Sequence, residues 1–525
     1  MWRLMALAFA IGISDSVWAK TPPDTLIVAR SIDDIASLDP AESFEITATN
    51  TLVNLYQRLL EPDRQNPSVL VPALAKSWVA ASDDKSLTFE LRDGATFASG
   101  NAVRPEDVIY SFKRVAKLNK TPAFILGELG WTADNIDGFL TKVDDHHVKI
   151  AWPAGVGSAF ALSILSATPV SFIVDGVEVE KHAQGADLGN AWLKTHSAGT
   201  GAYALRSYIP HETVVLQANP HAAIAPKLKT VVIKNVTDPA TRRLLVVQGD
   251  ADLAFDLGAD QFSALEQQKG VSVQSFPSSM IYYLGINSGN TQVPALKNPA
   301  FWEAARWLVD YQSISKDLLK NQYSVHQAFL PSGVAGSLSE APFKLDVNKA
   351  KTILKNAGIA EGTKVELSVF NQPPYTDIAQ ALQSSFAKAG IDIAVRPLVE
   401  SELWAKMRSR DYQLIFTYWG MDYLDPNSNA STFTYNVANG PKTLAWRTQW
   451  DIPQLSQETR AAAAERDPQK RSALYGQLQK AVQDSSPFVV ALQGRNQVAV
   501  HDGVEGVLQN ITVSLPYFDQ VSKTK

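Results

Sequence analysis

The segment from residue 418 to residue 426 combines aromatic rings with carboxylates, and these side-chain types are suited to holding a small solute. It contains Tyr418, Trp419, Asp422, Tyr423 and Asp425. A carboxylate accepts charge-assisted hydrogen bonds from a cation. The rings of tyrosine and tryptophan combine a large apolar surface with one polar group. Binding chemistry is therefore the first hypothesis for this segment.

Motifs for catalysis or metal binding are missing from the sequence. It contains no Gly-x-Ser-x-Gly elbow, no His-Glu-x-x-His helix and no phosphate loop. It has no cysteine, which excludes a disulfide framework, a thiolate metal site and a cysteine nucleophile. The 8 histidines are scattered, and the adjacent His146 and His147 would diverge on a strand. We expect no catalytic residue, no metal and no cofactor.

The composition is that of an ordinary globular protein. Of its 525 residues, 45% are hydrophobic, and the net charge of −5 comes from both signs mixed along the chain. Without a basic block, nucleic acid is not an expected partner. A chain of this length exceeds what one hydrophobic core usually holds, so we expect two or three lobes.

The N-terminus has the pattern of an export signal. Arg3 precedes an apolar run over residues 4–13, and Ala19 is a small residue that fits cleavage before Lys20. A membrane anchor is the alternative, but spanning a bilayer takes roughly 20 apolar residues. No later segment is apolar for long enough either, and there is no cysteine for a lipid anchor. We expect residues 1–19 to be a cleaved signal peptide and the mature chain to be a monomer in a Gram-negative periplasm.

The segment from 364 to 419 predicts a layered α/β domain. Strand patterns alternate there with helical patterns, and Gly390 follows the first helix as a C-cap. The predicted strands cover 365–370, 391–395 and 412–419, and the predicted helices cover 377–389 and 400–410.

The loop after Trp419 is where this architecture would place a ligand, because ligands of α/β domains sit beyond the carboxyl ends of the strands. Tyr418 and Trp419 are consecutive strand residues, so their rings should lie on opposite faces, one toward the cleft and one toward the core. Asp425 precedes Pro426, and we interpret it as a turn or capping residue.

Two patterns organise the N-terminal part. A helical pattern runs from residue 47 to about residue 60, with Leu52, Leu55, Tyr56 and Leu59 on one face. Residues 199–203 form a glycine-punctuated turn that leads into strands.

A series of short motifs occurs in the order found in one known family. The chain resembles the dipeptide and oligopeptide solute-binding proteins of ABC importers, extracellular solute-binding protein family 5, over about residues 25–510. The motifs that carry this resemblance are residues 37–40, 71–78, 87–94, 106–112, 199–203, 283–287, 301–310, 346–358 and 419–426.

The resemblance implies a two-lobed α/β fold of the type II periplasmic-binding-protein (Venus-flytrap) kind, with a hinge of two chain crossings and an extra subdomain on lobe one. Lobe one would comprise residues 20–282 together with 495–525, and the extra subdomain about 61–184. Lobe two would comprise residues 283–494.

The resemblance also assigns roles within the 418–426 segment. In peptide-binding members, an aspartate at the position of Asp422 pairs with the ligand's α-ammonium group, and a tryptophan at the position of Trp419 contacts the ligand. We place Tyr418 and Tyr423 in the same ligand-binding set.

Three further residues and one departure complete the expected site. The family's cleft is lined by the loop that here carries Phe44 and Glu45, and oligopeptide binders carry an aromatic residue against the peptide where this chain has Phe124. Phe416 occupies a place where such binders can carry arginine. Phenylalanine cannot hold a carboxylate, so a long peptide bound in their manner is in doubt.

The function implied is the periplasmic substrate-binding component of an ABC importer. It would capture a peptide or peptide-like solute by lobe closure and deliver it to the permease and ATPase in the inner membrane. A non-peptide solute (an opine, an oligosaccharide, a glutathione-like compound or a metal chelate) is the alternative ligand. A periplasmic sensor and a hydrolase with a similar cleft are the alternative functions.

Overall fold

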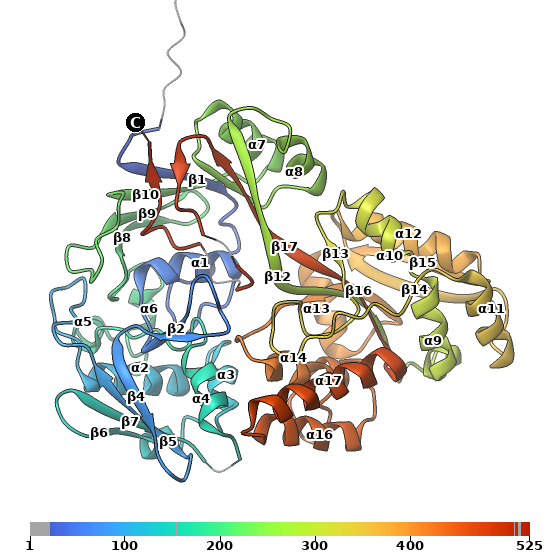
Figure 1. Cartoon of the computed structure of the whole chain (residues 1–525), viewed down its shortest axis with the longest axis horizontal. Helices are drawn as coiled ribbons and strands as arrows, with labels where there is room; N and C mark the ends of the chain where they lie inside the picture. The colour runs from blue at the N-terminus through green and yellow to red at the C-terminus, as the bar shows by residue number, and fades with distance from the viewer. Residues whose placement is uncertain (1–20, 154, 509, 513–515, 525) are drawn as a thin grey trace, which may run out of the picture.

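The computed structural model describes residues 21–153, 155–508, 510–512 and 516–524. The predicted signal peptide, residues 1–19, and its cleavage site near Ala19 lie outside the described residues. Strands and helices gather into two bodies joined by long strands (Figure 1). Over the described ranges, no helix is both long and apolar enough to cross a lipid bilayer.

One 11-stranded sheet runs through both bodies. Its two longest strands, β12 (Val271–Ile286) and β17 (Phe488–His501), pair antiparallel and pass from one body to the other (Figure 1). Their pairing is irregular between Pro277 and Ile281. Proline has no amide hydrogen to give to a sheet ladder, so the ladder is weakened where the strands leave the first body.

The second lobe is the body built on β14 (Thr363–Phe370), β15 (Ile391–Leu398) and β16 (Leu414–Trp419). β14 pairs in parallel with both neighbours, and α12 (Tyr375–Ala387) and α13 (Glu400–Ser409) make the crossovers. The predicted alternation of strands and helices is confirmed. The lobe also contains β13 (Ser324–Val325), α9 (Pro299–Leu308), α10 (Tyr311–Ser313), α11 (Val347–Asn356), α14 (Pro426–Phe433), α15 (Leu444–Arg447), α16 (Pro453–Ala464) and α17 (Pro468–Ser485).

The first lobe is the body at the other end of the same sheet. Its buried strand β1 (Thr25–Arg30) pairs in parallel with β10 (Thr230–Asn235) and β11 (Leu253–Phe255). The apolar side chains of β1 and β10 pack with α1 (Ile46–Leu55) in one core cluster. The remaining elements are β8 (Tyr203–Ile209), β9 (Thr213–Ala218), α5 (Gly176–Lys181), α6 (Asn190–Leu193), α7 (Pro239–Gln248), α8 (Ala259–Leu265), β18 (Val504–Glu505) and β19 (Ser522–Lys523).

An extra subdomain with a sheet of its own lies beside the first lobe (Figure 1). Its four strands have the order β4-β5-β7-β6. α2 (Pro105–Leu118) packs on it, and its N-terminus is capped by Asp107, which accepts a hydrogen bond of 2.9 Å from the Arg104 amide. The other elements are β2 (Leu60–Pro62), β3 (Leu70–Pro72), β4 (Ala75–Ala80), β5 (Ser86–Leu91), β6 (Leu140–Lys142), β7 (His147–Ala151), α3 (Ala123–Gly127) and α4 (Ser158–Leu165).

The helix predicted over residues 47–60 is shorter than expected. α1 ends at Leu55, and Tyr56 is extended with φ −130° and ψ 154°. The Leu55 carbonyl accepts a hydrogen bond of 2.9 Å from the Gly201 amide instead of continuing the helix. This close approach needs a glycine, since a Cβ on Gly201 would lie 2.3 Å from the Asn54 carbonyl oxygen. A distant segment therefore stops the helix, and the local pattern could not reveal this.

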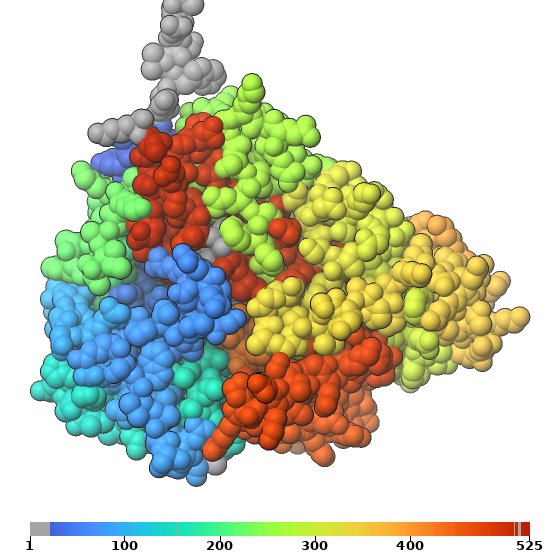
Figure 2. Space-filling model, viewed as in Figure 1, coloured from blue at the N-terminus to red at the C-terminus, as the bar shows by residue number. Residues whose placement is uncertain are grey.

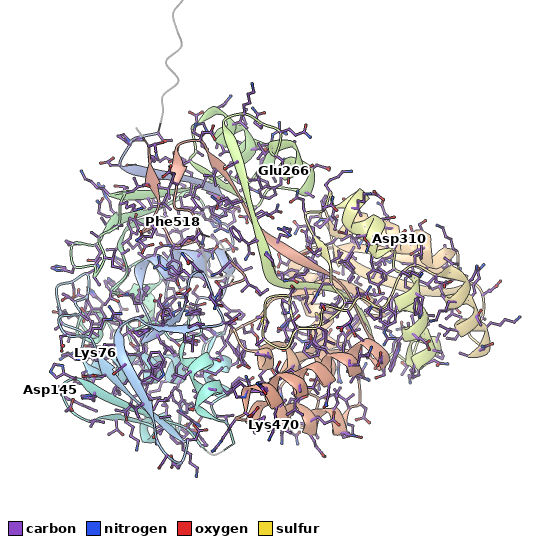
Figure 3. All side chains as sticks on the ribbon, viewed as in Figure 1. Lys76, Asp145, Glu266, Asp310, Lys470 and Phe518 are labelled. Carbon is purple, nitrogen blue, oxygen red and sulfur yellow. The ribbon has the colours of Figure 1, made fainter. Side chains whose placement is uncertain are left out.

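The two lobes touch on one face of the molecule. In the space-filling view, the blue N-terminal segments lie directly against the yellow and orange segments of the second lobe (Figure 2). Lys76 and Asp145 mark the outer side of the extra subdomain, and Asp310 lies at the opposite end, on the second lobe (Figure 3).

Candidate ligand-binding site

The loop after β16 lines a pocket that both lobes help to form. Residues 421–424 come from this loop, Ser279 from β12, and Arg58 and residues 166–168 from the first lobe and its subdomain. The Ser279 hydroxyl is buried and has no hydrogen-bond partner within the described part of the chain. The pocket therefore holds polar groups from both lobes, including one without a partner.

Asp422 is the charged side chain that the loop presents to this pocket. Its backbone amide donates a hydrogen bond of 2.9 Å to the Ser428 hydroxyl, which fixes the backbone at the start of α14. Its carboxylate makes no hydrogen bond or ion pair with any described residue. Burial and, to a smaller extent, the nearby Glu128 carboxylate raise the pKa of Asp422 to about 7, and Arg447 opposes both effects. The site thus contains a desolvated acceptor that has no hydrogen-bond or ion-pair partner among the described residues.

Glu128 is a second carboxylate that makes no hydrogen bond or ion pair with any described residue, and no sequence motif points to it. It caps the C-terminus of α3 in the extra subdomain and lies close enough to Asp422 to raise the pKa of that carboxyl. Burial alone raises the pKa of Glu128 to about 7. The sequence contains one indirect signal for Glu128. It lies four residues after Phe124, which the family resemblance had placed at the ligand.

Tyr418 and Trp419 lie on opposite faces of β16, as predicted. The Tyr418 ring packs against Phe370 and Trp404, at centroid distances of 6.1 and 5.8 Å. Burial raises the pKa of Tyr418 to about 12. The Trp419 ring faces the guanidinium of Arg447, whose central carbon is 6.0 Å from the ring centroid. Its indole Nε1 is buried without a partner among the described residues.

Phe44 and Phe124 are brought together. Their rings meet edge to face at 5.6 Å, and Phe124 remains 48% exposed. Glu45 precedes α1, and its side chain accepts a hydrogen bond of 3.2 Å from the Phe44 amide. These residues therefore form a partly exposed aromatic and acidic edge.

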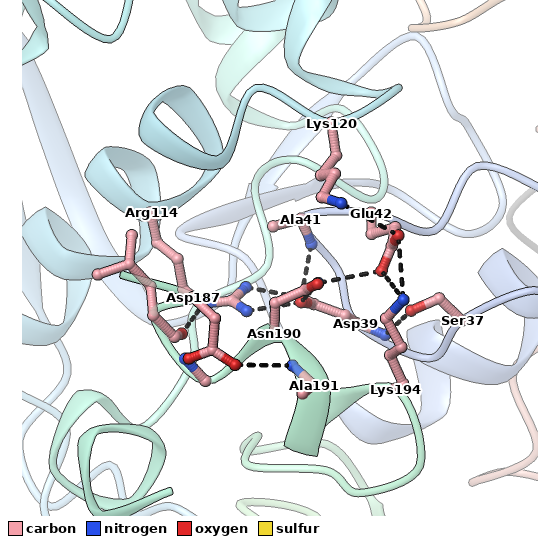
Figure 4. Close-up of polar contacts among 12 residues, drawn as sticks. Ser37, Asp39, Ala41, Glu42, Arg114, Lys120, Asp187, Asn190, Ala191 and Lys194 are labelled. Atoms are coloured by element: carbon pink, nitrogen blue, oxygen red, sulfur yellow. Dashed lines mark hydrogen bonds and ion pairs between the residues drawn. The ribbon is translucent and has the colours of Figure 1, made fainter. Parts of the chain in front are cut away.

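A buried ion pair positions the loop that carries Phe44 and Glu45 (Figure 4). Both Asp39 oxygens accept hydrogen bonds from Arg114 of α2, at 2.6 and 2.5 Å, and both side chains are almost fully buried. Glu42 of the same loop pairs with Lys194 at 3.3 Å and with Lys120 at 3.6 Å. The loop is thereby tied to both the first lobe and the extra subdomain.

Phe416 and Tyr423 have different surroundings. Phe416 is 1% exposed and lies in the core of the second lobe, opposite Leu284 of β12. Core packing occupies this side chain, so it is out of a ligand's reach in this conformation. Tyr423 lines the pocket and packs edge to face on Phe160 of the extra subdomain at 6.0 Å.

Asp425 is a capping residue, as predicted. Its side chain accepts a hydrogen bond of 2.8 Å from the Asn427 amide at the start of α14. The same carboxylate receives two hydrogen bonds from Arg471, at 2.9 and 2.7 Å. Ser163 of α4 donates to it as well, at 3.2 Å. Asp425 is therefore satisfied by the protein, whereas Asp422 is not.

Two α/β lobes that share long strands, with the Asp422 carboxylate in a pocket that both lobes line, define a two-lobed solute-binding protein. In the part of the chain that the structure describes, no three His, Asp or Glu side chains are placed to hold a metal ion.

The sequence profile of the bacterial extracellular solute-binding proteins, family 5 Middle, matches residues 69–441. The chain belongs to this family, whose members are transport binding proteins.

Curated relatives match over nearly the whole chain. The probable D,D-dipeptide-binding periplasmic protein DdpA of Escherichia coli K12 is 29% identical over 510 residues, which cover 96% of this chain and 94% of the relative. The glutathione-binding protein GsiB of Salmonella typhi is 24% identical, and the match covers 91% of both chains.

Solved structures confirm the predicted two-lobed fold. The periplasmic binding protein DppA from Helicobacter pylori, in complex with the peptide STSA, superposes with a TM-score of 0.80 at 21% identity and covers 95% of this chain and 98% of its own. AgaA from A. tumefaciens R10, in complex with agropinic acid, superposes with a TM-score of 0.77 at 20% identity and covers 95% of this chain and 99% of its own.

Proposed function

We propose that this protein is the periplasmic receptor of an ABC importer and that it captures a peptide-like solute with a positively charged amino group. The observation that carries the proposal is the Asp422 carboxylate, which lines a pocket between the lobes and makes no hydrogen bond or ion pair with any residue that the structure describes. An ammonium group would supply the missing charge-assisted hydrogen bonds. The two relatives point the same way, since their names give a D,D-dipeptide and glutathione as ligands, and both are short peptides.

Capture would proceed by closure of the lobes over the solute. Contacts already join the second lobe to the extra subdomain, including Tyr423 with Phe160 and the ion pair of 3.2 Å between Arg466 and Asp84. A ligand held by both lobes binds the closed state better and shifts the population toward it. The closed form would then deliver the intact solute to the permease and ATPase in the inner membrane.

We further propose the division of the chain into lobes. Lobe one comprises residues 20–282 with 495–525, including an extra subdomain at about 61–184, and lobe two comprises 283–494. The interrupted pairing of β12 after Pro277, opposite Arg495 of β17, supports a hinge at these boundaries.

The proposed ligand contacts follow the pocket and its rim. Asp422 binds the amino group, and Glu128 lies close to it. Phe416 is left out because it is buried in the core. The remaining proposed contacts are Trp419, Tyr418, Tyr423, Phe44, Glu45 and Phe124.

The test begins with the ligand that the protein carries. Protein produced with its export signal is purified, unfolded to release bound compounds, and the extract is analysed by mass spectrometry. We expect an intact amine-bearing compound of peptide type, and recovery of cleavage products would indicate a hydrolase instead. An opine, an oligosaccharide or a metal chelate recovered in stoichiometric amount would contradict the peptide class.

Substitution of Asp422 tests the binding group directly. The Asp422→Asn variant keeps the shape of the side chain and removes its charge, so affinity for the released amine should fall by about 1.5–3 kcal/mol, the range of a hydrogen bond to a charged group. Asp392→Asn is the matched control, because Asp392 is an exposed carboxylate on the same lobe. Calorimetry that gives equal affinities for the wild type and both variants would remove Asp422 from the site.

A further inference from the structure

Gln322 is a buried side chain of the second lobe whose hydrogen bonds go to the first lobe. It is 5% exposed and lies in the segment that leads into β13. Its Nε2 donates a hydrogen bond of 3.2 Å to the carboxylate of Glu266, which caps the C-terminus of α8. Its Oε1 accepts a hydrogen bond from Nε2 of Gln497 in β17, beyond the proposed lobe boundary at residue 495. Both ends of one side-chain amide therefore bind the first lobe.

The backbone before Gln322 has an uncommon conformation. Lys320 and Asn321 are consecutive residues with positive φ values of 50° and 60°. A π-helical turn, Ile314–Leu318, precedes them. Left-handed φ values are costly for a residue such as lysine, and both features occur at functional sites, where the surrounding contacts fix them. This turn presents Gln322 to the first lobe, and a hydrogen bond of 2.8 Å from its amide to the Leu319 carbonyl holds it in place.

The lobes are joined at two separate places in this conformation. Glu266 lies with α8 near the upper end of the long strands, where Figure 3 labels it, whereas α4 lies lower down, in the extra subdomain (Figure 1). There, Ser163 of α4 donates a hydrogen bond of 3.2 Å to Asp425 of the second lobe. The contact at Gln322 is therefore separate from the contacts between the second lobe and the extra subdomain.

Movement of the lobes would break the bonds of Gln322. The pairing of β12 with β17 is irregular between Pro277 and Ile281. Glu266 and Gln497 lie on the first-lobe side of this irregularity, and Gln322 belongs to the second lobe. An N–H···O hydrogen bond holds at donor–acceptor distances of about 2.7–3.2 Å, so a rotation of one lobe about this point separates the partners. The two bonds are therefore specific to the closed arrangement.

We infer that Gln322 is an interlobe latch that stabilises the closed arrangement before any ligand binds. This inference rests on the proposed function only in that the lobes open and close. The apparent affinity for a solute that binds the closed form is proportional to the fraction of the protein that is already closed. The latch raises this fraction without touching the solute. It therefore raises the affinity for every such solute by the same factor.

Gln479 provides a matched control for the latch. It is a fully buried glutamine of α17 in the second lobe. Its Nε2 donates hydrogen bonds to the carbonyls of Gly336 and Tyr475, at 2.6 and 3.1 Å, and its Oε1 accepts one of 3.2 Å from the Leu338 amide. These partners all belong to the second lobe. Gln479→Met therefore removes a buried amide of the same type without changing a contact between the lobes.

Single-molecule energy transfer in the chain without residues 1–19 measures the ratio of closed to open protein in the absence of ligand. The chain has no native cysteine, so dyes can be attached at Asp145→Cys and Lys470→Cys, two exposed positions on the extra subdomain and the second lobe (Figure 3). We expect Gln322→Met to lower the ratio about 2- to 10-fold, the range for loss of one hydrogen bond. Glu266→Ala should lower it similarly, and this variant leaves the core intact because Glu266 is exposed. Gln479→Met should leave the ratio unchanged.

Thermal unfolding of each variant establishes that it folds. A ratio that stays the same or rises in Glu266→Ala would overturn the latch, and so would a wild type without a closed population. A fall of the same size in Gln479→Met would also overturn it, since lost stability alone would then account for the shift. The measurement contains no ligand, so each of these results leaves the proposed peptide class of the ligand as it stands.

Discussion

Asp422 in the pocket and Glu128 near it are desolvated carboxylates that make no hydrogen bond or ion pair with any described residue, so we expect ligand binding at the proposed site to depend on pH. Burial raises the pKa of Asp422 and that of Glu128 to about 7 each. Only the ionised form of Asp422 pairs with an ammonium group, and a peptide amine stays protonated below its own pKa of roughly 8. Acidification therefore removes the acceptor while the ligand keeps its charge.

We predict that affinity for an amine-bearing ligand falls about tenfold between pH 7 and pH 5.5. The reason is that protonation of a group with a pKa near 7 competes with the ligand over this range. Calorimetric titrations at intermediate pH values measure the slope. Asp422→Asn should show a shallower slope, and a wild-type affinity that is constant across the range would contradict the role of the carboxylates.

The site residues that the sequence identified are those close to a recognisable motif. Trp419 ends a strand whose position could be predicted, Asp422 and Tyr423 follow that strand, and Asp425 could be interpreted from the proline after it. Glu128 could not be found in this way, because its significance is that its carboxylate is desolvated and makes no hydrogen bond or ion pair with any described residue. Burial depends on the packing of distant segments, as it does for Phe416 in the core.

At the scale of elements, local pattern predicted the second lobe well. The apolar alternation of β14, β15 and β16 and the spacing of α12 and α13 are set within each segment. α1 differs, since its C-terminus is fixed by the glycine turn at residues 199–201. The sequence predicted both the helix and the turn but not that they meet.

We predict that Gly201→Ala lowers the free energy of unfolding by about 2–3 kcal/mol, the range for overpacking a well-packed interior. The added Cβ would lie 2.3 Å from the Asn54 carbonyl oxygen and 2.4 Å from the Leu55 carbonyl carbon, which are backbone atoms that cannot rotate away. Gly127→Ala is the control, since its Cβ would meet nothing within 4 Å. Urea denaturation measures both, and equal stabilities would show that the contact is not tight.

At the scale of the whole molecule, the central sheet connects the lobes and the pocket separates them. β12 and β17 form a continuous link, and their irregular pairing near Pro277 gives that link a place to bend. The contacts across the cleft include polar and edge-to-face ones, such as Ser163 with Asp425 and Tyr423 with Phe160. Such contacts can open and reform around a ligand.

Small-angle X-ray scattering of the protein without residues 1–19, first free of ligand and then saturated with the compound that it carries, tests the capture mechanism most directly. The account predicts a smaller radius of gyration and a shorter maximum dimension with the ligand bound. Scattering curves that superimpose, under conditions in which calorimetry demonstrates saturation, would contradict closure of the lobes around the solute.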